Sequence, residues 1–389
     1  MHSLYKWIVL FGSFIIYLFD SLEISILAFA LPEISKDFSI DAVQAGLLAS
    51  ATLVGMGLAG PIMGWLADTY GRKTALIVCI GVFIVLTSVI YIIPTFELLL
   101  VIRFIAGIGL GGVWSILSAF VHETWPAKYR GFAVTFVLSA FPVGAIVAAQ
   151  LSGAMLPDWR MLFLVAGMGG CFALAITVFT FRESTEWALA SVDTSSIGKI
   201  FRGSYRRITL IASTIATLAF IGYYGVITWL PSYLEHNRGL SSQTVGNYLS
   251  WLNLGMFFGY IVFGFIADLI GKRSALCLSL LGVGILMPVY GLVTDRTVLL
   301  WLGPLYAFFM TFAGLFGPYL GALYPTAIRA TGAGFCFNVG RGISAFAPMI
   351  LGVIASLASL SVGLIISGIL FFIAGVLVLA LPKVKETQK

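Results

Sequence analysis

Charged side chains are scarce in this sequence. Asp, Glu, Lys and Arg make up 10% of its 389 residues, against roughly 25% in soluble domains. A soluble chain of this length needs far more polar surface, so the composition excludes an ordinary soluble domain. The sequence also has only three His and four Cys. It contains no CxxC pair, no Ser-His-Asp grouping and no phosphate loop, so we expect no metal site, no catalytic residue and no enzyme activity.

Apolar residues are abundant instead, at 60% of the chain with 31 Phe and 43 Gly. Twelve apolar segments are each long enough to cross about 30 Å of hydrocarbon. Asp20 and Glu23 interrupt the first segment, so we expect an uncleaved span and not a signal peptide. The predicted spans are residues 7–31, 42–67, 74–93, 97–123, 131–154, 160–181, 208–234, 243–267, 274–293, 298–323, 332–356 and 361–381. The expected fold class is an all-α membrane protein with twelve transmembrane helices.

The distribution of Lys and Arg predicts the orientation. Of the 22 basic residues, sixteen fall on one side of the predicted spans and four on the other, and only Arg103 and Arg341 lie inside spans. The positive-inside rule places the richer side, with both termini, in the cytoplasm. We therefore expect a multi-pass, monomeric protein of the plasma (inner) membrane. The same bias accounts for the pI near 9.1, so the lipid bilayer is an expected partner and nucleic acid is not.

An internal repeat divides the chain into halves. The sequence GWLADTYGRK at 64–73 returns as GFIADLIGKR at 264–273, with the Gly, Asp and paired basic residues in register. A Trp-Pro pair followed by Arg130 is echoed by a Tyr-Pro pair followed by Arg329. Such a duplication predicts two six-helix halves that bury their faces against each other. The expected organisation is an N-terminal half at 1–181, a cytoplasmic central loop at 182–207 and a C-terminal half at 208–389.

On these two matched loops, the sequence resembles the major facilitator superfamily over its whole length. The resemblance implies two pseudo-symmetric halves and transport by alternating access. It also implies a cytoplasmic gate in which charged residues after the second and eighth spans hold the halves together; a role in topology alone stays an alternative. The candidate gate residues are Asp68, Arg72, Lys73, Glu123, Arg130, Asp268, Lys272, Arg273 and Arg329.

Shorter motifs resemble one branch of that superfamily, the proton symporters of sialic acid and aromatic acids. The first span carries Phe19-Asp20-Ser21-Leu22-Glu23, similar to the DGFD and DGYD signatures of the branch, and RFIAGIGLGG at 103–112 is similar to its fourth-span glycine motif. RESTEW at 182–187 is similar to the PESxxW sequence that follows its sixth span. The resemblance implies import of a small organic anion with a proton, driven by the proton gradient without a cofactor. Ser21, Leu22, Glu23 and Arg182 depart from the branch pattern and leave the particular acid open.

Four ionisable residues lie deep in predicted spans, where each costs at least about 2.5–3.5 kcal/mol. Asp20 and Glu23 share one helix face, and Glu23 lies at a depth similar to that of Arg103. Two neighbouring carboxylates in a poorly hydrated site do not both ionise readily, so one should hold a proton near neutral pH. We predict that Asp20, Glu23 and Arg103 couple transport to protons and that the planar guanidinium of Arg341 binds a substrate carboxylate. Purely structural pairing of each Arg remains an alternative.

Further substrate contacts are predicted from polar and aromatic residues inside spans. The Gly-Tyr-Tyr-Gly sequence at 222–225, with Trp229, predicts a broken seventh helix with aromatic walls. Helix–helix hydrogen bonding explains the polar candidates equally well. The candidates are Tyr223, Tyr224, Trp229, Asn338, Asn253 and Gln150. A symporter of a neutral, sugar-like solute and an efflux antiporter stay open as alternative functions, although the glycine-proline cluster of the antiporters is absent from 139–144.

Overall fold

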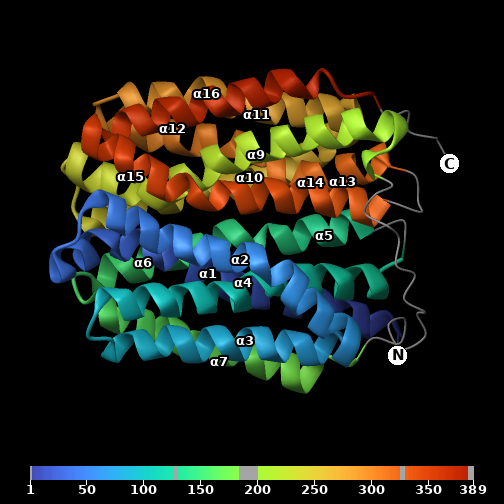
Figure 1. The fold of residues 1–389 in the computed structure, drawn as a ribbon, viewed down its shortest axis with the longest axis horizontal. Coiled ribbons are helices and arrows are strands. Elements are labelled where there is room, and N and C mark those ends of the chain that lie inside the picture. The colour runs from blue at the N-terminus through green and yellow to red at the C-terminus, as the bar shows by residue number, and fades with distance from the viewer. Residues whose placement is uncertain (1, 127–129, 184–199, 325–328, 384–389) are drawn as a thin grey trace.

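The computed structural model describes residues 2–126, 130–183, 200–324 and 329–383. Within these residues, twelve helical segments are long and apolar enough to cross a membrane, and no strand is present. The prediction of an all-α, twelve-span membrane protein is therefore confirmed, and the expected six-plus-six arrangement is visible as two stacked groups of helices (Figure 1).

The first half contains helices α1 to α7 and the second contains α9 to α16. The bounds in the first half are α1 His2–Phe38, α2 Ala42–Tyr70, α3 Arg72–Val89, α4 Phe96–Thr124, α5 Arg130–Leu138, α6 Ala140–Met155 and α7 Trp159–Thr180. Those in the second are α9 Gly203–Ser232, α10 Ser242–Ile270, α11 Lys272–Leu292, α12 Arg296–Phe309, α13 Phe312–Leu323, α14 Arg329–Ile343, α15 Ala347–Leu357 and α16 Leu360–Val378.

Three predicted spans are each built from two helices. The fifth is divided between α5 and α6 at Ser139, because the ring of Pro142 conflicts with the carbonyl four residues before it, that of Leu138. The eleventh is divided between α14 and α15 by a short 3₁₀ turn just before Pro348, for the same reason. The tenth bends between α12 and α13 at Met310 and Thr311. The first helix is longer than predicted and continues through Pro32 to Phe38.

Both chain termini lie at one end of the bundle, on the right in Figure 1, and we call the opposite end the far end. Helices that begin at the far end start with side-chain caps. Asp41 forms a capping box with Gln44 at the start of α2, and Asp158 and Asp295 accept hydrogen bonds from the first turns of α7 and α12. Each cap satisfies a backbone N–H group that the helix itself leaves unpaired.

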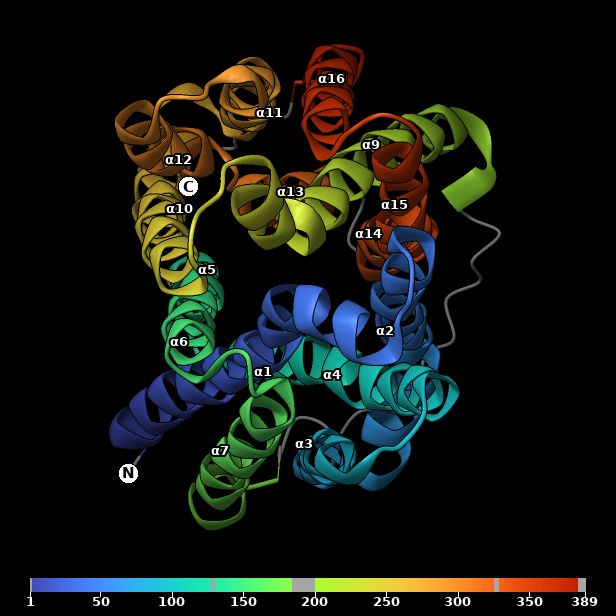
Figure 2. The same ribbon diagram turned by 90° about the vertical axis from the view of Figure 1, so that its left-hand side faces the viewer.

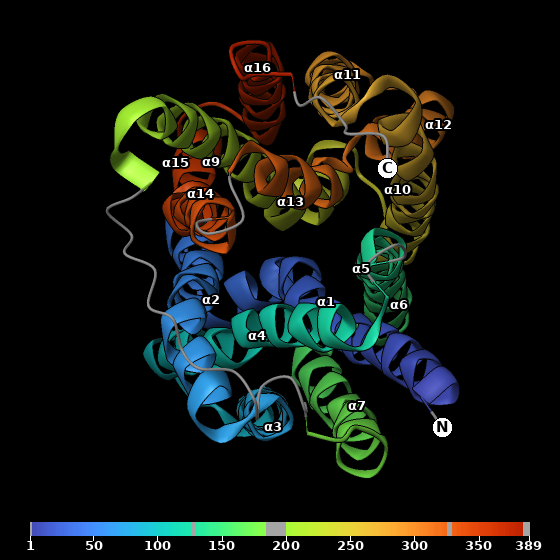
Figure 3. The same cartoon turned by 90° about the vertical axis from the view of Figure 1, so that its right-hand side faces the viewer.

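The two halves face each other along a central seam. Viewed along the bundle, α1 and α4 lie opposite α9 and α13, while α2 runs beside α14 and α15 and α6 runs beside α10 (Figures 2 and 3). Peripheral helices such as α3, α7 and α12 lie outside this seam. The seam helices therefore determine which side chains of one half meet those of the other.

At the far end, the halves approach to backbone contact. A Cβ atom added to Gly46 of α2 would lie 2.5 Å from the carbonyl oxygen of Pro348, and one added to Gly246 of α10 would lie 2.6 Å from that of Ala149. Ser50 also accepts a hydrogen bond of 3.2 Å from the backbone N–H of Met349. Only glycine permits such approach, so the α2/α15 and α6/α10 contacts close the seam at the far end.

The sequence repeat is also a repeat of contacts. Gly71 and Gly271 adopt positive φ angles of 102° and 87° at the α2–α3 and α10–α11 junctions, a conformation that glycine adopts without strain. Lys73 Nζ donates to the carbonyl oxygen of Val178 at 2.7 Å, and Arg273 Nε donates to that of Val378 at 3.2 Å. In each half, a basic residue at the start of one helix thus holds the end of the half's last helix.

Candidate functional site

The three predicted proton-coupling residues form a buried group in the first half. Asp20 and Glu23 of α1 and Arg103 of α4 are 0–1% exposed. Arg103 Nε donates to the hydroxyl of Thr52 on α2 at 3.2 Å, and its guanidinium carbon lies 5.6 Å from the ring centroid of Phe163. The group is therefore assembled from four helices, with Arg103 fixed by α2 and α7.

Glu23 and Arg103 interact electrostatically, yet no ion pair within 4 Å joins them among the described residues. Both carboxylate oxygens of Glu23 and both terminal nitrogens of Arg103 lack hydrogen-bond partners there. Each unsatisfied buried group costs roughly 1–3 kcal/mol, and a charged one costs more. The first half thus contains a buried carboxyl group and a buried guanidinium that interact but are not directly bonded.

Arg341 of α14 projects from the second half towards Asp20. Its Nε donates to the hydroxyl of Tyr224 at 3.0 Å, while no described residue forms a hydrogen bond with its terminal nitrogens. Asp20 and Arg341 interact electrostatically across the seam, and Oδ1 of Asp20 also lacks a hydrogen-bond partner among the described residues. The two carboxyl groups therefore have different basic partners: Glu23 interacts with the Arg of its own half and Asp20 with the Arg of the other, while Asp20 also interacts with Glu23.

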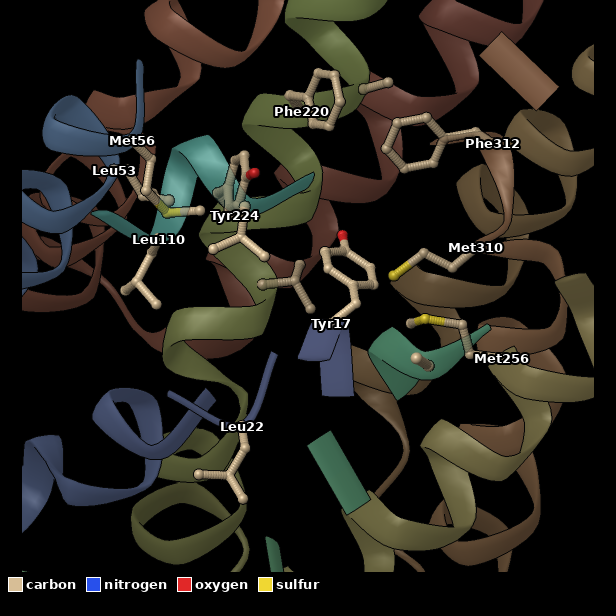
Figure 4. Close-up of a cluster of buried hydrophobic side chains, with 14 of the residues drawn as sticks. Tyr17, Leu22, Leu53, Met56, Leu110, Phe220, Tyr224, Met256, Met310 and Phe312 are labelled. Atoms are coloured by element: carbon tan, nitrogen blue, oxygen red, sulfur yellow. The ribbon is translucent and has the colours of Figure 1, made fainter. Parts of the chain in front are cut away.

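Aromatic side chains from both halves surround Arg341. The ring of Tyr17 lies 5.0 Å from Trp114 and 6.0 Å from Phe141. Phe141 in turn lies 6.4 Å from Tyr223, which belongs to the opposite half. Figure 4 shows Tyr17 and Tyr224 with apolar side chains of both halves around them, among them Met256 and Met310. An apolar wall around one incompletely bonded guanidinium suits an anion with an apolar body.

A cavity lies between the halves on the far-end side of this cluster. Its space not filled by atoms is about 490 Å³, of which the centre of a water molecule can reach about 40 Å³. The reachable volume is enough for water and too small for a ligand such as an aromatic acid. Residues of α1, α6, α9, α10 and α12 line it, including Ser25, Tyr223, Asn253, Met256 and Tyr306. A second, more open pocket lies at the far end beside Trp229 and His236, and the centre of a water molecule can reach about 560 Å³ of it.

The gate region is described only in part. The side chains of five gate candidates lie outside the described part of the structure: Asp68, Glu123, Arg130, Asp268 and Arg329. Glu183, which the sequence did not single out as a gate residue, accepts hydrogen bonds of 3.1 and 3.2 Å from the backbone N–H of Lys73. A carboxylate at the first turn of α3 interacts favourably with the positive end of the helix dipole. Glu183 thus ties the start of the central loop to the α2–α3 junction.

Three predicted substrate contacts, Gln150, Trp229 and Asn338, are not among the residues that line the central cavity. Gln150 Nε2 donates to Ser250 Oγ at 2.7 Å and so bridges α6 and α10. Trp229 Nε1 donates to the carbonyl oxygen of Pro348 at 2.8 Å, which places it in the α2/α15 region of the far-end seam. Asn338 is exposed, one turn from Arg341 on α14. Asn253 and Tyr223 do line the central cavity.

The predicted break in the seventh helix is wrong. Helix α9 continues through 222–225 to Ser232. The two glycines make space for neighbours: a Cβ on Gly222 would meet the ring of Phe371 at 2.8 Å, and one on Gly225 would meet the side chain of Leu351 at 3.0 Å. Close packing against α16 and α15 therefore explains the two glycines.

Three residues near the site were missed from the sequence. Tyr17 lies one turn before Asp20 on the same helix face, and this spacing was a usable signal. Tyr260, which interacts electrostatically with Tyr17 and Tyr223, comes from a helix whose apolar sequence gives no such signal. Thr52, the hydrogen-bond partner of Arg103, is one of many hydroxyl residues in spans.

Comparison with known proteins gives consistent matches. The sequence model of the Major Facilitator Superfamily matches residues 11–318. The cis,cis-muconate transport protein of Acinetobacter baylyi is 32% identical over 388 residues, covering 96% of this chain and 94% of that relative. The sialic acid transporter NanX of Escherichia coli is 29% identical over 369 residues, covering 93% and 90%. The xylose transporter XylE of E. coli superposes with a TM-score of 0.82 at 16% identity, covering 99% and 100%, a likeness of fold alone.

Proposed function

Because the chain belongs to the major facilitator superfamily, we propose that it imports a small organic acid, such as sialic acid, an aromatic acid or a similar monocarboxylate, together with a proton by alternating access. The relatives named for muconate and sialic acid transport support the substrate class. We propose further that it resides in the plasma (inner) membrane with both termini in the cytoplasm, where the positive-inside rule places them.

The observation that carries this proposal is the environment of Arg341. Tyr224 holds its Nε at 3.0 Å, so the two terminal nitrogens point away from this anchor as a fork that a carboxylate matches in shape. The aromatic rings of Tyr17 and Tyr223 supply an apolar surface beside the fork. An acid is then recognised by two features: its carboxylate binds the guanidinium of Arg341, and its apolar part packs against the two aromatic rings.

Charge balance explains why a proton accompanies the acid. Asp20, Glu23, Arg103 and Arg341 are neutral as a set when all four are ionised. A substrate carboxylate adds one negative charge to this poorly hydrated region, and protonation of Asp20 removes it. Because Asp20 and the substrate compete for Arg341, a proton on Asp20 also frees the guanidinium for the substrate. The Glu23–Arg103 pair balances its own charge within the first half and therefore stays ionised.

Competition with matched solutes tests the substrate class. Uptake of radiolabelled benzoate into cells expressing the protein should be inhibited by unlabelled benzoate and much less by benzamide, which has the same ring without the charge. Equal inhibition by the acid and the amide would contradict acid transport and favour a carrier of neutral solutes. Cells with the empty vector provide the background.

A further inference from the structure

The central cavity contains two polar groups whose hydrogen bonds are incomplete. Ser25 of α1 is 5% exposed, and its hydroxyl has no hydrogen-bond partner among the described residues. Several helical hydroxyls of this chain bond to their own helix, as Ser250 does to the carbonyl oxygen of Gly246 at 2.8 Å, whereas that of Ser25 forms no such bond. The hydroxyl of Ser25 is therefore available to the cavity that it lines.

Asn253 of α10 lines the same cavity from the other half. Its Nδ2 donates to the carbonyl oxygen of Leu249 at 2.8 Å, and this bond fixes the side-chain amide. No described residue donates to Oδ1. The cavity thus has a free donor on one half, the hydroxyl of Ser25, and a free acceptor on the other. Most buried polar groups have partners, so two incomplete groups on one cavity point to a solute or water that completes them.

Their positions relative to the carboxylate site follow from helix geometry. Ser25 lies five residues beyond Asp20 on α1, roughly 7.5 Å towards the far end. Asn253 lies two turns from Tyr260 on α10, roughly 10 Å in the same direction and on the same helix face. Tyr223 interacts electrostatically with Arg341 and also lines the cavity, so it connects the two places. The thioether of Met256 and the aromatic ring of Tyr306 line the cavity as well.

We propose that Ser25 and Asn253 determine specificity by binding a hydroxyl group on the end of the substrate remote from its carboxylate. A solute hydroxyl both donates and accepts, so it donates to Oδ1 of Asn253 and accepts from the hydroxyl of Ser25. The preferred substrate class is then an organic acid with an apolar ring and a hydroxyl opposite the carboxylate. This inference rests on the proposed function, because it takes Arg341 as the carboxylate site.

The test compares benzoate with 4-hydroxybenzoate, which differ only in that hydroxyl. Dissociation constants are measured by titration calorimetry on the purified protein. Wild type should bind 4-hydroxybenzoate about tenfold more tightly, the effect of one to two hydrogen bonds. Ser25→Ala and Asn253→Leu should each reduce the ratio of the two constants to about threefold, and the double variant should reduce it to about one. A site built around a hydroxyl discriminates against the analogue without it.

Ser13→Ala is the matched control, because Ser13 is a buried Ser of the same helix whose hydroxyl also lacks a described partner. It lies outside the residues that line the cavity, so the ratio should stay at the wild-type value. Thermal unfolding of each variant confirms that it is folded. Equal affinity of wild type for the two acids, or a preference that survives in the double variant, would overturn the inference and leave the proposed function standing. Binding of neither acid by the folded protein would overturn the inference and, in the proposed function, the transport of aromatic acids.

Discussion

Replacing Arg341 tests the substrate site most sharply. In Arg341→Lys the positive charge remains, but an ammonium group cannot bond Tyr224 and at the same time present two parallel donors to a carboxylate. The wild-type geometry offers two terminal nitrogens to the substrate, since Nε is occupied by Tyr224 at 3.0 Å. A hydrogen bond to a charged group contributes roughly 1.5–3 kcal/mol. Loss of one such bond weakens binding about 10- to 150-fold.

Two further variants should reduce substrate affinity to different extents. Arg341→Ala removes both bonds and the charge, so affinity should fall more than about 100-fold. Tyr224→Phe removes only the anchor of Nε and leaves both bonds to the substrate possible, so a smaller loss of about 2- to 10-fold is expected. Calorimetric titration of each purified variant with benzoate measures these values. Arg160→Lys is the control, because it makes the same substitution at the far end, next to Asp37, and should leave the affinity for benzoate unchanged. Affinities of the Lys and Ala variants within about twofold of wild type would refute carboxylate binding by Arg341.

Three further predictions concern coupling, the gate and the seam. Asp20→Asn mimics the protonated carboxyl group permanently, so exchange of acid across the membrane should persist while accumulation driven by a proton gradient is lost; undiminished accumulation would place the proton site elsewhere. Glu183→Gln weakens the contact with the α2–α3 junction and should slow transport several-fold at equal expression, measured as initial uptake rate, with an unchanged rate arguing for a purely structural contact. Gln150→Ala removes the side-chain bridge between α6 and α10, so a cysteine introduced at Ala149 should react with a water-soluble thiol reagent about tenfold faster; equal rates would show that this bridge does not hold the seam.

The helices were predictable because hydrophobic length is a strong signal in a membrane protein. The boundaries were less so. The division of the fifth span at Ser139 follows from Pro142, which was visible in the sequence, whereas the bend at Met310 has no comparable marker. The far-end seam also escaped prediction, since a Gly such as Gly46 gives no indication of which backbone it will contact.

The buried charges were predictable individually, because each is costly in hydrocarbon. Their pairing was not fully predictable. Helix spacing placed Asp20 and Glu23 on one face, and the two do interact, but the spacing could not show that Asp20 also interacts with Arg341 of the other half. Gln150 shows a second limit: its position in a span suggested a substrate contact, but polarity alone gave no indication of its hydrogen bond to Ser250 between two helices.

Accumulation in proteoliposomes tests the central claim most directly. Purified protein is reconstituted into liposomes, an inward proton gradient is imposed, and internal radiolabelled acid is measured over time beside protein-free liposomes, which correct for diffusion of the protonated acid. The account predicts transient accumulation above the protein-free level that disappears with an uncoupler and in Arg341→Ala. Accumulation no greater than in protein-free liposomes, by a protein shown to exchange the acid, would contradict proton-coupled import.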